Sequence, residues 1–364
     1  MKNLNKKTAV ILFNLGGPDS PSAVKPFLFN LFNDRAIISL PQPFRFLLAK
    51  FISGKREQKA QKIYAQIGGK SPILEFTQQQ AYALERELSF SGNFKTFIAM
   101  RYWKPRAKDV VKDVKNFAPD QIILLPLYPQ FSSATSESSI IEFKKKLASE
   151  FGSSAKKIIV KTICCYPTEQ DFIKSHSLLI KQTILKYYSD FSDFRFLFSA
   201  HGLPQKLIDA GDPYVFQVKK TTDEIVKNLA EILSKKPEEI DAKICYQSKV
   251  GRLQWTSPSL DQEIKRAALD KKIPVIVPVS FVSDHSETLV ELDVDYKEMA
   301  ENLGIEKYLR VPALNADGNF IKSLANICAK VDLNNEATFF SAEKPVRICS
   351  KKMKLCSNPN RCES

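Results

Sequence analysis

Short runs of almost uninterrupted apolar residues recur along the chain, and longer amphipathic stretches separate most of them. The runs of strand length cover residues 8–15, 94–100, 121–127, 156–163, 194–200, 242–247 and 273–281. Continuous apolar strands that alternate with helices are typical of parallel sheets covered by helices on both faces. The pattern therefore predicts an α/β fold with doubly wound parallel sheets.

The alternation is too long for one modest sheet, and a chain of 364 residues is larger than an ordinary single domain. We therefore predict two similar lobes, residues 1–165 and 166–331, with a final helix at 317–331 and a tail at 332–364. In doubly wound folds, ligands bind beyond the carboxyl ends of the strands. The unusual residues gather at such strand ends, in segments 14–18, 199–202 and 283–285.

One segment of the first lobe, residues 26–56, is rich in Phe, Leu and Ile and is flanked by basic residues at 45, 50, 55 and 56. An apolar helix of this kind is often ordinary core. Its apolar residues are nevertheless dense on more than one face, as in a segment that rests on a membrane interface or lines an apolar cleft. Both interpretations stay open from the sequence, and we refer to residues 26–56 as the lip segment.

The chain carries 54 basic and 40 acidic residues, a formal charge of +14. This balance favours an anionic partner, such as a carboxylate-bearing substrate or a lipid surface. The excess is spread along the chain and no nucleic-acid motif is present, so we expect no nucleic-acid binding. No run reaches the roughly 18 apolar residues that span a bilayer, and the N-terminus enters a strand without a signal-peptide cleavage site. We expect a cytoplasmic protein.

Only three histidines occur, so the surroundings of each one are informative. His176 lies in a helical stretch without polar neighbours, which favours packing or surface exposure. His201 directly follows an apolar strand in a Ser-Ala-His-Gly-Leu-Pro turn and should project into a cleft. Its alternative role is that of a turn histidine whose ring is satisfied by backbone groups.

The third histidine, His285, adjoins a cluster of carboxylates. Asp284, Glu287 and Glu291 are spaced i, i+3 and i+7, which places them on one face of a predicted helix. Asp284 and Glu287 also fit a capping box at a helix start. Carboxylates beside a neutral imidazole suit iron or zinc, and an imidazole accepts protons near neutrality. Motifs of nucleotide-binding proteins and standard hydrolases are missing.

Several motifs together resemble one known family. They are NLGGPDS, IGGKSPI, RYWKP, LPLYPQFS, FSAHGLP, QSKVGRLQW and SFVSDHSETLVELD, in family order over about 330 residues. In this respect the chain resembles the ferrochelatases, lyases that insert ferrous iron into protoporphyrin IX to make haem. The resemblance implies two Rossmann-like, chelatase-type lobes with the porphyrin in a cleft between them.

The resemblance also implies roles for particular residues. His201 and Glu287 would form the pair that handles the metal and the protons. Whether the histidine binds iron or removes pyrrole protons stays open. Glu291, Asp284 and His285 would assist the pair. The residues expected to contact the porphyrin are Arg56, Tyr64, Ser71, Arg101, Tyr128, Trp255 and Phe281. The implied partners are protoporphyrin IX and Fe²⁺, with a peripheral contact to the inner membrane and a monomeric or homodimeric state left open.

Seven cysteines occur in a chain without an export signal, so structural disulfides are not expected. We interpret Cys245 and Cys328 as packing residues. The tail cysteines Cys349, Cys356 and Cys362 resemble those that hold a [2Fe-2S] cluster in some ferrochelatases. The fourth ligand of the animal-type pattern is replaced by a serine at 133, so Cys164 or Cys165 is the candidate. A zinc site and three free thiols are the alternatives.

Three other functions remain open at this point. A chelatase of the same fold can use coproporphyrin III in place of protoporphyrin, or can insert another metal. The apolar lip segment favours the more apolar protoporphyrin. A non-catalytic haem or porphyrin carrier would need the cleft but not the base, and the combination of His201 with Glu287 and Glu291 argues against a carrier.

Overall fold

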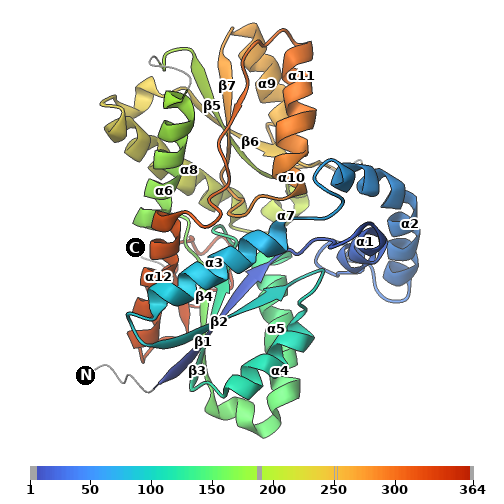
Figure 1. Cartoon of the computed structure of the whole chain (residues 1–364), viewed down its shortest axis with the longest axis vertical. Coiled ribbons are helices and arrows are strands. Elements are labelled where there is room, and N and C mark those ends of the chain that lie inside the picture. Colours follow the sequence, from blue (N-terminus) through green and yellow to red (C-terminus); the bar gives the residue numbers. More distant parts are fainter. Residues whose placement is uncertain (1–5, 187–190, 250, 252, 361–364) are drawn as a thin grey trace. The chain divides into compact units, whose positions relative to one another are not determined.

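Parallel strands alternate with helices through most of the molecule, a computed structural model that describes residues 6–186, 191–249, 251 and 253–360 (Figure 1). The chain divides into two units, and each has its own sheet. The first unit contains residues 1–165, 324–350 and 356–364, and the second contains residues 166–323 and 351–355. The predicted α/β class with two doubly wound parallel sheets is confirmed.

The first unit is built on a parallel sheet of strand order β2-β1-β3-β4-β9. Its strands are β1 Lys7–Asn14, β2 Asn93–Met100, β3 Gln121–Pro126, β4 Ile159–Cys165 and β9 Phe339–Ser341. Alternate residues of β1, from Ala9 to Phe13, pack against α4 and α5, and the residues between them are equally buried. Burial on both faces explains why β1 is apolar without alternation.

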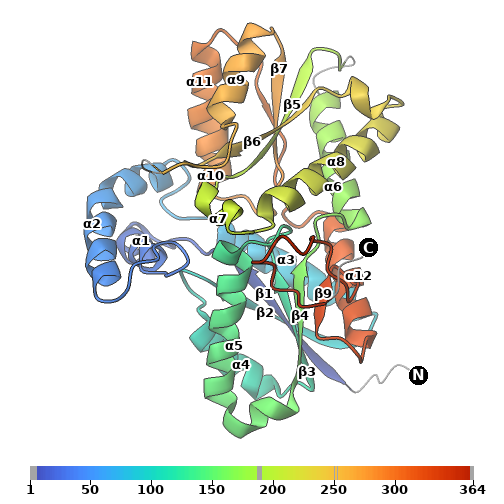
Figure 2. The same ribbon diagram turned by 180° about the vertical axis from the view of Figure 1, so that it is seen from behind.

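Six helices in the described part of the chain accompany this sheet. They are α1 Val24–Phe32, α2 Phe44–Ala65, α3 Ile73–Leu88, α4 Ala107–Phe117, α5 Ser138–Phe151 and α12 Gly318–Leu333. Figures 1 and 2 show α3 on one face of the sheet and α4 with α5 on the other. Helix α12 begins in the second unit and continues into the first from Leu324 onward.

The second unit has a parallel sheet of order β6-β5-β7-β8. Its strands are β5 Phe194–His201, β6 Ala242–Gln247, β7 Ile273–Pro278 and β8 Leu309–Arg310. Its helices are α6 Gln170–Leu185, α7 Gln205–Asp209, α8 Tyr214–Ile232, α9 Leu260–Leu269, α10 Ser286–Leu289 and α11 Tyr296–Asn302, with a π-helical turn at Glu291–Asp295. The strand β5 lies between β6 and β7, so its carboxyl end is flanked by theirs.

All seven predicted strands are present, and the described residues form two further short strands that the pattern does not predict. The run at 242–247 has the bounds of β6, whereas β4 starts at Ile159, later than predicted, because residues 152–157 form a 3₁₀ helix. The strands β8 and β9 have only two and three residues, too short for an apolar run to stand out.

The domain boundaries differ from the prediction at the C-terminal end. The structure also divides the chain after Cys165, but most of the final helix and the tail belong to the first unit, not to the second lobe or a separate segment. Two contacts explain this. Strand β9 pairs with β4, and the ammonium group of Lys161 in β4 donates to the carbonyls of Val331 (2.7 Å) and Asp332 (3.0 Å) at the end of α12.

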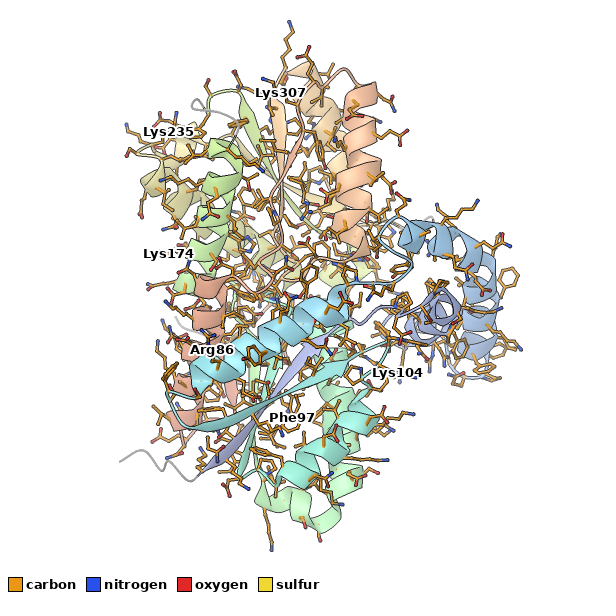
Figure 3. The ribbon with its side chains drawn as sticks, viewed as in Figure 1. Arg86, Phe97, Lys104, Lys174, Lys235 and Lys307 are labelled. Carbon is orange, nitrogen blue, oxygen red and sulfur yellow. The ribbon has the colours of Figure 1, made fainter. Side chains whose placement is uncertain are left out.

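The basic side chains labelled in Figure 3 project outward from separate elements of both units. Arg86 lies on α3, Lys174 on α6, and Lys235 and Lys307 in loops of the second unit. This agrees with a positive charge that is spread over the chain. In the described part of the chain, no helix is both long enough and apolar enough to cross a bilayer.

His176 is a packing residue of α6. It is 1% exposed, and its ring makes an edge contact with Phe172 at 4.9 Å. Among the residues that the structure describes, neither ring nitrogen has a hydrogen-bond partner. Burial lowers the pKa of His176 to about 3. The folded protein therefore keeps this ring neutral at pH values where the unfolded chain, with a histidine pKa near 6.5, binds a proton.

His176→Leu should stabilise the protein, most strongly in acid. Removing two unsatisfied buried nitrogens should raise the free energy of unfolding by about 1 kcal/mol near pH 8. Near pH 5 the gain should be roughly 2 kcal/mol larger, because the unfolded state no longer gains a proton. Urea unfolding at both pH values measures this, and a gain that does not depend on pH would contradict the argument.

Candidate functional site

The carboxyl end of β5 brings His201 to Glu287. The Nδ1 atom of His201 lies 2.9 Å from Oε2 of Glu287. His201 is the last residue of β5, and Glu287 lies in the first turn of α10, which follows the adjacent strand β7. Two residues 86 positions apart thus meet because neighbouring parallel strands end at the same edge. The sequence placed both residues at strand ends, and the structure adds their direct contact.

The two groups shift each other's protonation. Burial lowers the pKa of His201, but the charge and hydrogen bond of Glu287, together with Glu291, outweigh burial and raise it above the ordinary value. Burial in turn raises the pKa of Glu287, but His201 and then His285 outweigh burial and lower it. Near neutrality Glu287 is therefore ionised, and its charge favours the protonated form of the His201 imidazole. The His201 side chain is 36% exposed, so this base is accessible.

Glu291 is held by the loop that follows β6. Its carboxylate accepts hydrogen bonds from the backbone N–H of Ser248 (2.8 Å) and from the Ser248 hydroxyl (2.6 Å). Gln247, the last residue of β6, donates from Nε2 to the carbonyl of Glu287 at 2.9 Å. Burial and the charge of Glu287 raise the pKa of Glu291. Glu287 and Glu291 thus differ in proton affinity although they are near neighbours.

Ser248 and Gln247 were not predicted as site residues from their chemistry. Both lie in the QSKVGRLQW segment, one of the motifs that carry the family resemblance. Ser248 has a φ of +65°, a backbone conformation that non-glycine residues seldom adopt. A polar residue directly after an apolar strand was the available signal, and it was too common to single out Ser248.

Asp284 and His285 lie in a different arrangement from the predicted helical face. Helix α10 begins at Ser286, so Asp284 precedes it, and the residue that caps the helix is His285, through Thr288. The alternative that Asp284 and Glu287 form a capping box is therefore wrong. Asp284 accepts instead from Arg310, Asn315 and Thr288, each at 2.8 Å.

His285 is turned toward the pair but does not hydrogen-bond to it. Its Nδ1 lies 3.0 Å from the carbonyl of Ser283, and its Nε2 lies 3.8 Å from Oε2 of Glu287. Because Asp284 is bound elsewhere, the predicted three carboxylates do not converge. Among the residues that the structure describes, no three His, Cys, Asp or Glu side chains are grouped as a metal site. A metal at His201 and Glu287 would need further ligands from water or from a substrate.

Two aromatic residues expected to contact the porphyrin lie beside His201. The ring of Phe281 meets the His201 ring edge-on at 6.5 Å and also lies 4.9 Å from the ring of His285. Trp255 forms an antiparallel bridge with Pro204. A Cβ on Gly202 would meet Trp255 at 3.3 Å and the carbonyl of Gln247 at 3.0 Å, so the turn after His201 favours a glycine.

The other five expected porphyrin contacts belong to the first unit. Tyr64 and Ser71 are buried, and Tyr128 packs beside a core cluster. Arg56 is partly exposed, and its guanidinium lies 5.7 Å from the ring centre of Phe32. A side chain can turn toward a ligand without other changes only if it is exposed. Arg56 therefore remains the best candidate of the five for a porphyrin contact.

Arg101 is already engaged by protein carboxylates. It donates to Asp34 at 2.6 Å and to Glu142 at 2.7 Å, and its side chain is 14% exposed. The same Asp34 oxygen accepts from the hydroxyl of Tyr102 at 2.8 Å. Arg101 therefore ties the end of α1 to α5, whereas the family resemblance implies that it contacts the porphyrin.

The lip segment exposes large apolar side chains to solvent. Phe44, Leu47 and Phe51 are 65%, 60% and 66% exposed and lie along the start of α2. The neighbouring Ile37, Leu40 and Phe46 are also exposed. Isolated exposed apolar residues are ordinary, but a group of this size marks a contact surface. The interpretation of residues 26–56 as simple core does not hold for this face.

Four cysteines gather in the first unit. Cys164 and Cys165 end β4, and Cys349 and Cys356 of the tail are buried like them. Hydrogen bonds from the thiols of Cys164 and Cys349 lower the pKa of Cys356 well below the ordinary value, and hydrogen bonding with Cys165 and Cys356 raises that of Cys164. Cys356 is thus the favoured thiolate. Cys362 lies outside the described residues.

The remaining cysteines fit the packing role predicted for them. Cys245 and Cys328 are both fully buried, and burial raises the pKa of both thiols.

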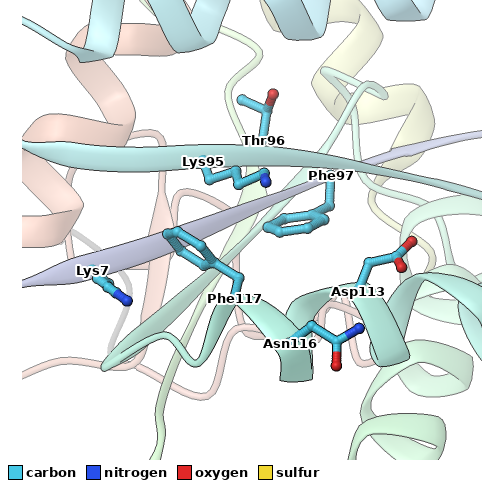
Figure 4. Close-up of a pocket in the computed structure, with 7 residues that line it drawn as sticks. All are labelled: Lys7, Lys95, Thr96, Phe97, Asp113, Asn116 and Phe117. Atoms are coloured by element: carbon cyan, nitrogen blue, oxygen red, sulfur yellow. The ribbon is translucent and has the colours of Figure 1, made fainter.

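A surface hollow of about 570 Å³ lies at the amino ends of β1 and β2 (Figure 4). The ammonium groups of Lys7 and Lys95 sit 5.6 and 5.7 Å from the ring centre of Phe117, beside Phe97. Ligands of doubly wound sheets bind at the opposite, carboxyl edge. The hollow is therefore not the site that the fold favours.

Comparison with known proteins gives a consistent result. The sequence model of the ferrochelatase family matches residues 7–331. A ferrochelatase of Rickettsia felis is 48% identical over 355 residues, covering 97% of this chain and 98% of the relative, and one of Pelagibacter ubique is 47% identical, covering 96% and 98%. The solved structure of SirB from Bacillus subtilis with Fe³⁺ has a similar fold (TM-score 0.53, 12% identity, 91% of this chain and 97% of that one).

Proposed function

This chain belongs to the ferrochelatase family, and on that premise we propose that it inserts Fe²⁺ into protoporphyrin IX with His201 and Glu287 as the reacting pair. The enzyme is then a lyase of haem biosynthesis. The observation that carries the assignment of the site is the 2.9 Å contact between an accessible imidazole and a carboxylate at the carboxyl edge of the second sheet.

Insertion replaces two pyrrole protons with one Fe²⁺, so the site must accept protons. With Nδ1–H of His201 donated to Glu287, the Nε2 atom carries the free lone pair and can accept a pyrrole proton. The imidazolium that forms is stabilised by the Glu287 carboxylate in direct contact. Each accepted proton can then pass to bulk water.

Glu291 offers the next proton acceptor. Its raised pKa means that it takes up a proton more readily than Glu287 does, so protons that leave the pair have a carboxylate of higher affinity beside them. Ser248 fixes the orientation of this carboxylate. The ion pair between the buried Asp284 and Arg310 helps to position Glu287, because it ties the start of α10 to β8.

The experiment that tests the function is anaerobic incubation of the pure protein with Fe²⁺ and a porphyrin, followed by absorption spectroscopy. Conversion of protoporphyrin IX to protohaem supports the proposal. A strong preference for coproporphyrin III would assign the sister reaction, and tight binding without metal insertion would assign a carrier.

The exposed apolar group of the lip segment supports a peripheral membrane contact as part of this function. Phe44, Leu47 and Phe51 are exposed to solvent in the first half of α2, and Arg45 and Lys50 lie next to them in the sequence. Apolar side chains flanked by cations suit an anionic lipid surface. Such a surface is also where an apolar porphyrin dissolves.

Replacing Phe44 and Phe51 together by serine should weaken binding to anionic phospholipid vesicles. Each fully buried phenylalanine contributes roughly 1.5 to 3 kcal/mol, so the pair should reduce partitioning by at least about 100-fold. Vesicle co-sedimentation measures this. Phe90→Ser is the matched control, since Phe90 is 82% exposed outside the lip segment. Equal loss in the control, or none in the double variant, would contradict the proposal.

We also propose that the tail cysteines hold a metal group, with a [2Fe-2S] cluster as the leading candidate. The thiols suit such a group in donor type, since Cys356 is hydrogen-bonded to both Cys164 and Cys349 and favours its thiolate form. The described cysteines are not yet grouped as a metal site, so a bound cluster would have to draw them together. We favour Cys164 over Cys165 as the internal ligand, because the Cys164 thiol is hydrogen-bonded to Cys356. When bound, the cluster supplies one-electron chemistry. Cys362 would complete four thiolates.

Protein purified without oxygen should then be coloured, and Cys356→Ser should abolish the colour. Visible absorption, electron paramagnetic resonance after reduction, and iron and sulfide content measure the cluster. Cys328→Ser is the control, because Cys328 is a buried packing cysteine. Colourless protein with one bound zinc would show that the site binds zinc. Metal-free protein would show that the tail cysteines are free thiols.

A further inference from the structure

The tail of the chain contacts a glycine in the loop between α7 and α8. Gly211 has a φ of +98°, and a Cβ at this position would lie 2.7 Å from the backbone nitrogen of Lys354 and 3.2 Å from the carbonyl oxygen of Lys352. The backbone N–H of Leu355 donates to the carbonyl of Gly211 at 3.1 Å. Residues 351–355 thus sit on Gly211 so closely that no side chain fits between them.

The loop under this contact leads directly into α8. The carboxylate of Asp212 accepts from the backbone N–H of Tyr214 at 3.0 Å, and Asp212 is 3% exposed. Gly211 itself donates to the carbonyl of Ile208 at 2.9 Å, which closes the end of α7. A shift of Gly211 would therefore displace the first turn of α8.

That first turn carries a buried tyrosine near the reacting pair. Tyr214 is 6% exposed, and burial, with Glu287 among the charges that add to it, raises its pKa. The phenol therefore stays neutral and lies within electrostatic reach of the Glu287 carboxylate. Tyr214 has no part in the proton path through His201, Glu287 and Glu291, but the charge of Glu287 acts on its phenol.

We propose that residues 351–355, seated on Gly211, are a positioning element that fixes the first turn of α8 and, with it, the buried Tyr214. The proposal deepens the proposed function and rests on it. The tail would then influence the reacting pair, in addition to holding a metal group with its cysteines. The segment is bounded by the buried Cys349 and Cys356, so both of its ends are anchored.

Gly211→Ala tests the contact, and Gly304→Ala is its matched control. Both glycines belong to the second unit and have positive φ, but a Cβ on Gly304 meets no atom within 4 Å. Both variants carry a backbone strain of roughly 1 to 2 kcal/mol, whereas only Gly211→Ala pushes against the tail. Leu355→Pro is a second variant, which removes the donor N–H from the tail side and leaves α7 and α8 unchanged.

Three measurements follow on the full-length protein. Trypsin cleavage at the exposed Lys351, Lys352 and Lys354 reports release of the tail, and it should become at least about tenfold faster in Gly211→Ala and Leu355→Pro. Hydrogen exchange should rise in residues 210–218. The kcat for iron insertion should fall roughly 10- to 100-fold while the KM for the porphyrin stays near the wild-type value. Gly304→Ala should show none of these changes.

The outcomes separate this proposal from the proposed function. A released tail with kcat and hydrogen exchange equal to those of Gly304→Ala would overturn the positioning role. A tail that stays protected in both variants would overturn the contact itself. If the wild-type protein inserts no iron, the proposed function fails, whereas cleavage and exchange still decide whether the tail orders the first turn of α8.

Discussion

His201→Ala is expected to abolish iron insertion while porphyrin binding persists. Removing a general base costs about 100- to 10,000-fold in rate, because no other accessible imidazole replaces it. His285 is 6% exposed and its Nδ1 is engaged at the carbonyl of Ser283, so it is a poor substitute. The measurement is kcat from protohaem formation, with the porphyrin Kd from fluorescence quenching.

The control for this variant is His176→Leu, which removes a histidine of the same unit that lies in the core. It should retain wild-type kcat. Added imidazole should restore part of the activity of His201→Ala, since a small base can enter the space left by the ring. Activity near wild-type in His201→Ala would assign proton removal to another group, and loss of porphyrin binding would show that the ring holds the substrate.

Glu287→Gln is expected to lower kcat by about 100-fold and to move the acid side of its pH profile to lower pH. The imidazole accepts a proton only when it is neutral, so the rate rises as the pH passes the pKa of His201. Glu287 raises that pKa. Without this charge, burial dominates and the pKa falls, so the neutral base persists in more acidic solution.

The matched control is Glu298→Gln on α11, an exposed carboxylate of the same unit. Its pH profile should coincide with that of the wild type. The profiles of kcat are measured between about pH 5.5 and 9 with saturating porphyrin. A shift to higher pH in Glu287→Gln, or an unchanged acid side, would show that the limiting protonation is not that of the histidine in contact with this carboxylate.

The sequence predicted the strands of this fold well because buried parallel strands are apolar throughout. Strand β1 is buried on both faces, and such runs stand out from their surroundings. The strand β9 could not be found in this way, since its three residues are specified by pairing with β4 far away in the sequence. The tail therefore looked like a separate segment.

For the site, the sequence placed His201 and Glu287 at strand ends, and the family resemblance implied that they act as a pair, but the geometry of their contact was not predictable. Their meeting depends on the neighbouring positions of β5 and β7. The environment of Asp284 was unpredictable because its partners Arg310 and Asn315 follow 26 and 31 residues later. Spacing along one helix describes local geometry, whereas these partners come from a distant loop and strand.

The passage of α12 from one unit into the other has a consequence for biosynthesis. A ribosome releases residues 166–323 before residues 324–350, so most of the second unit is available to fold while the first still lacks its edge strand β9. Until then the open edge of β4 is a template for pairing with other chains. Nascent chains whose β9 has not yet emerged from the ribosome therefore expose this edge, and a chaperone that covers it would limit such pairing.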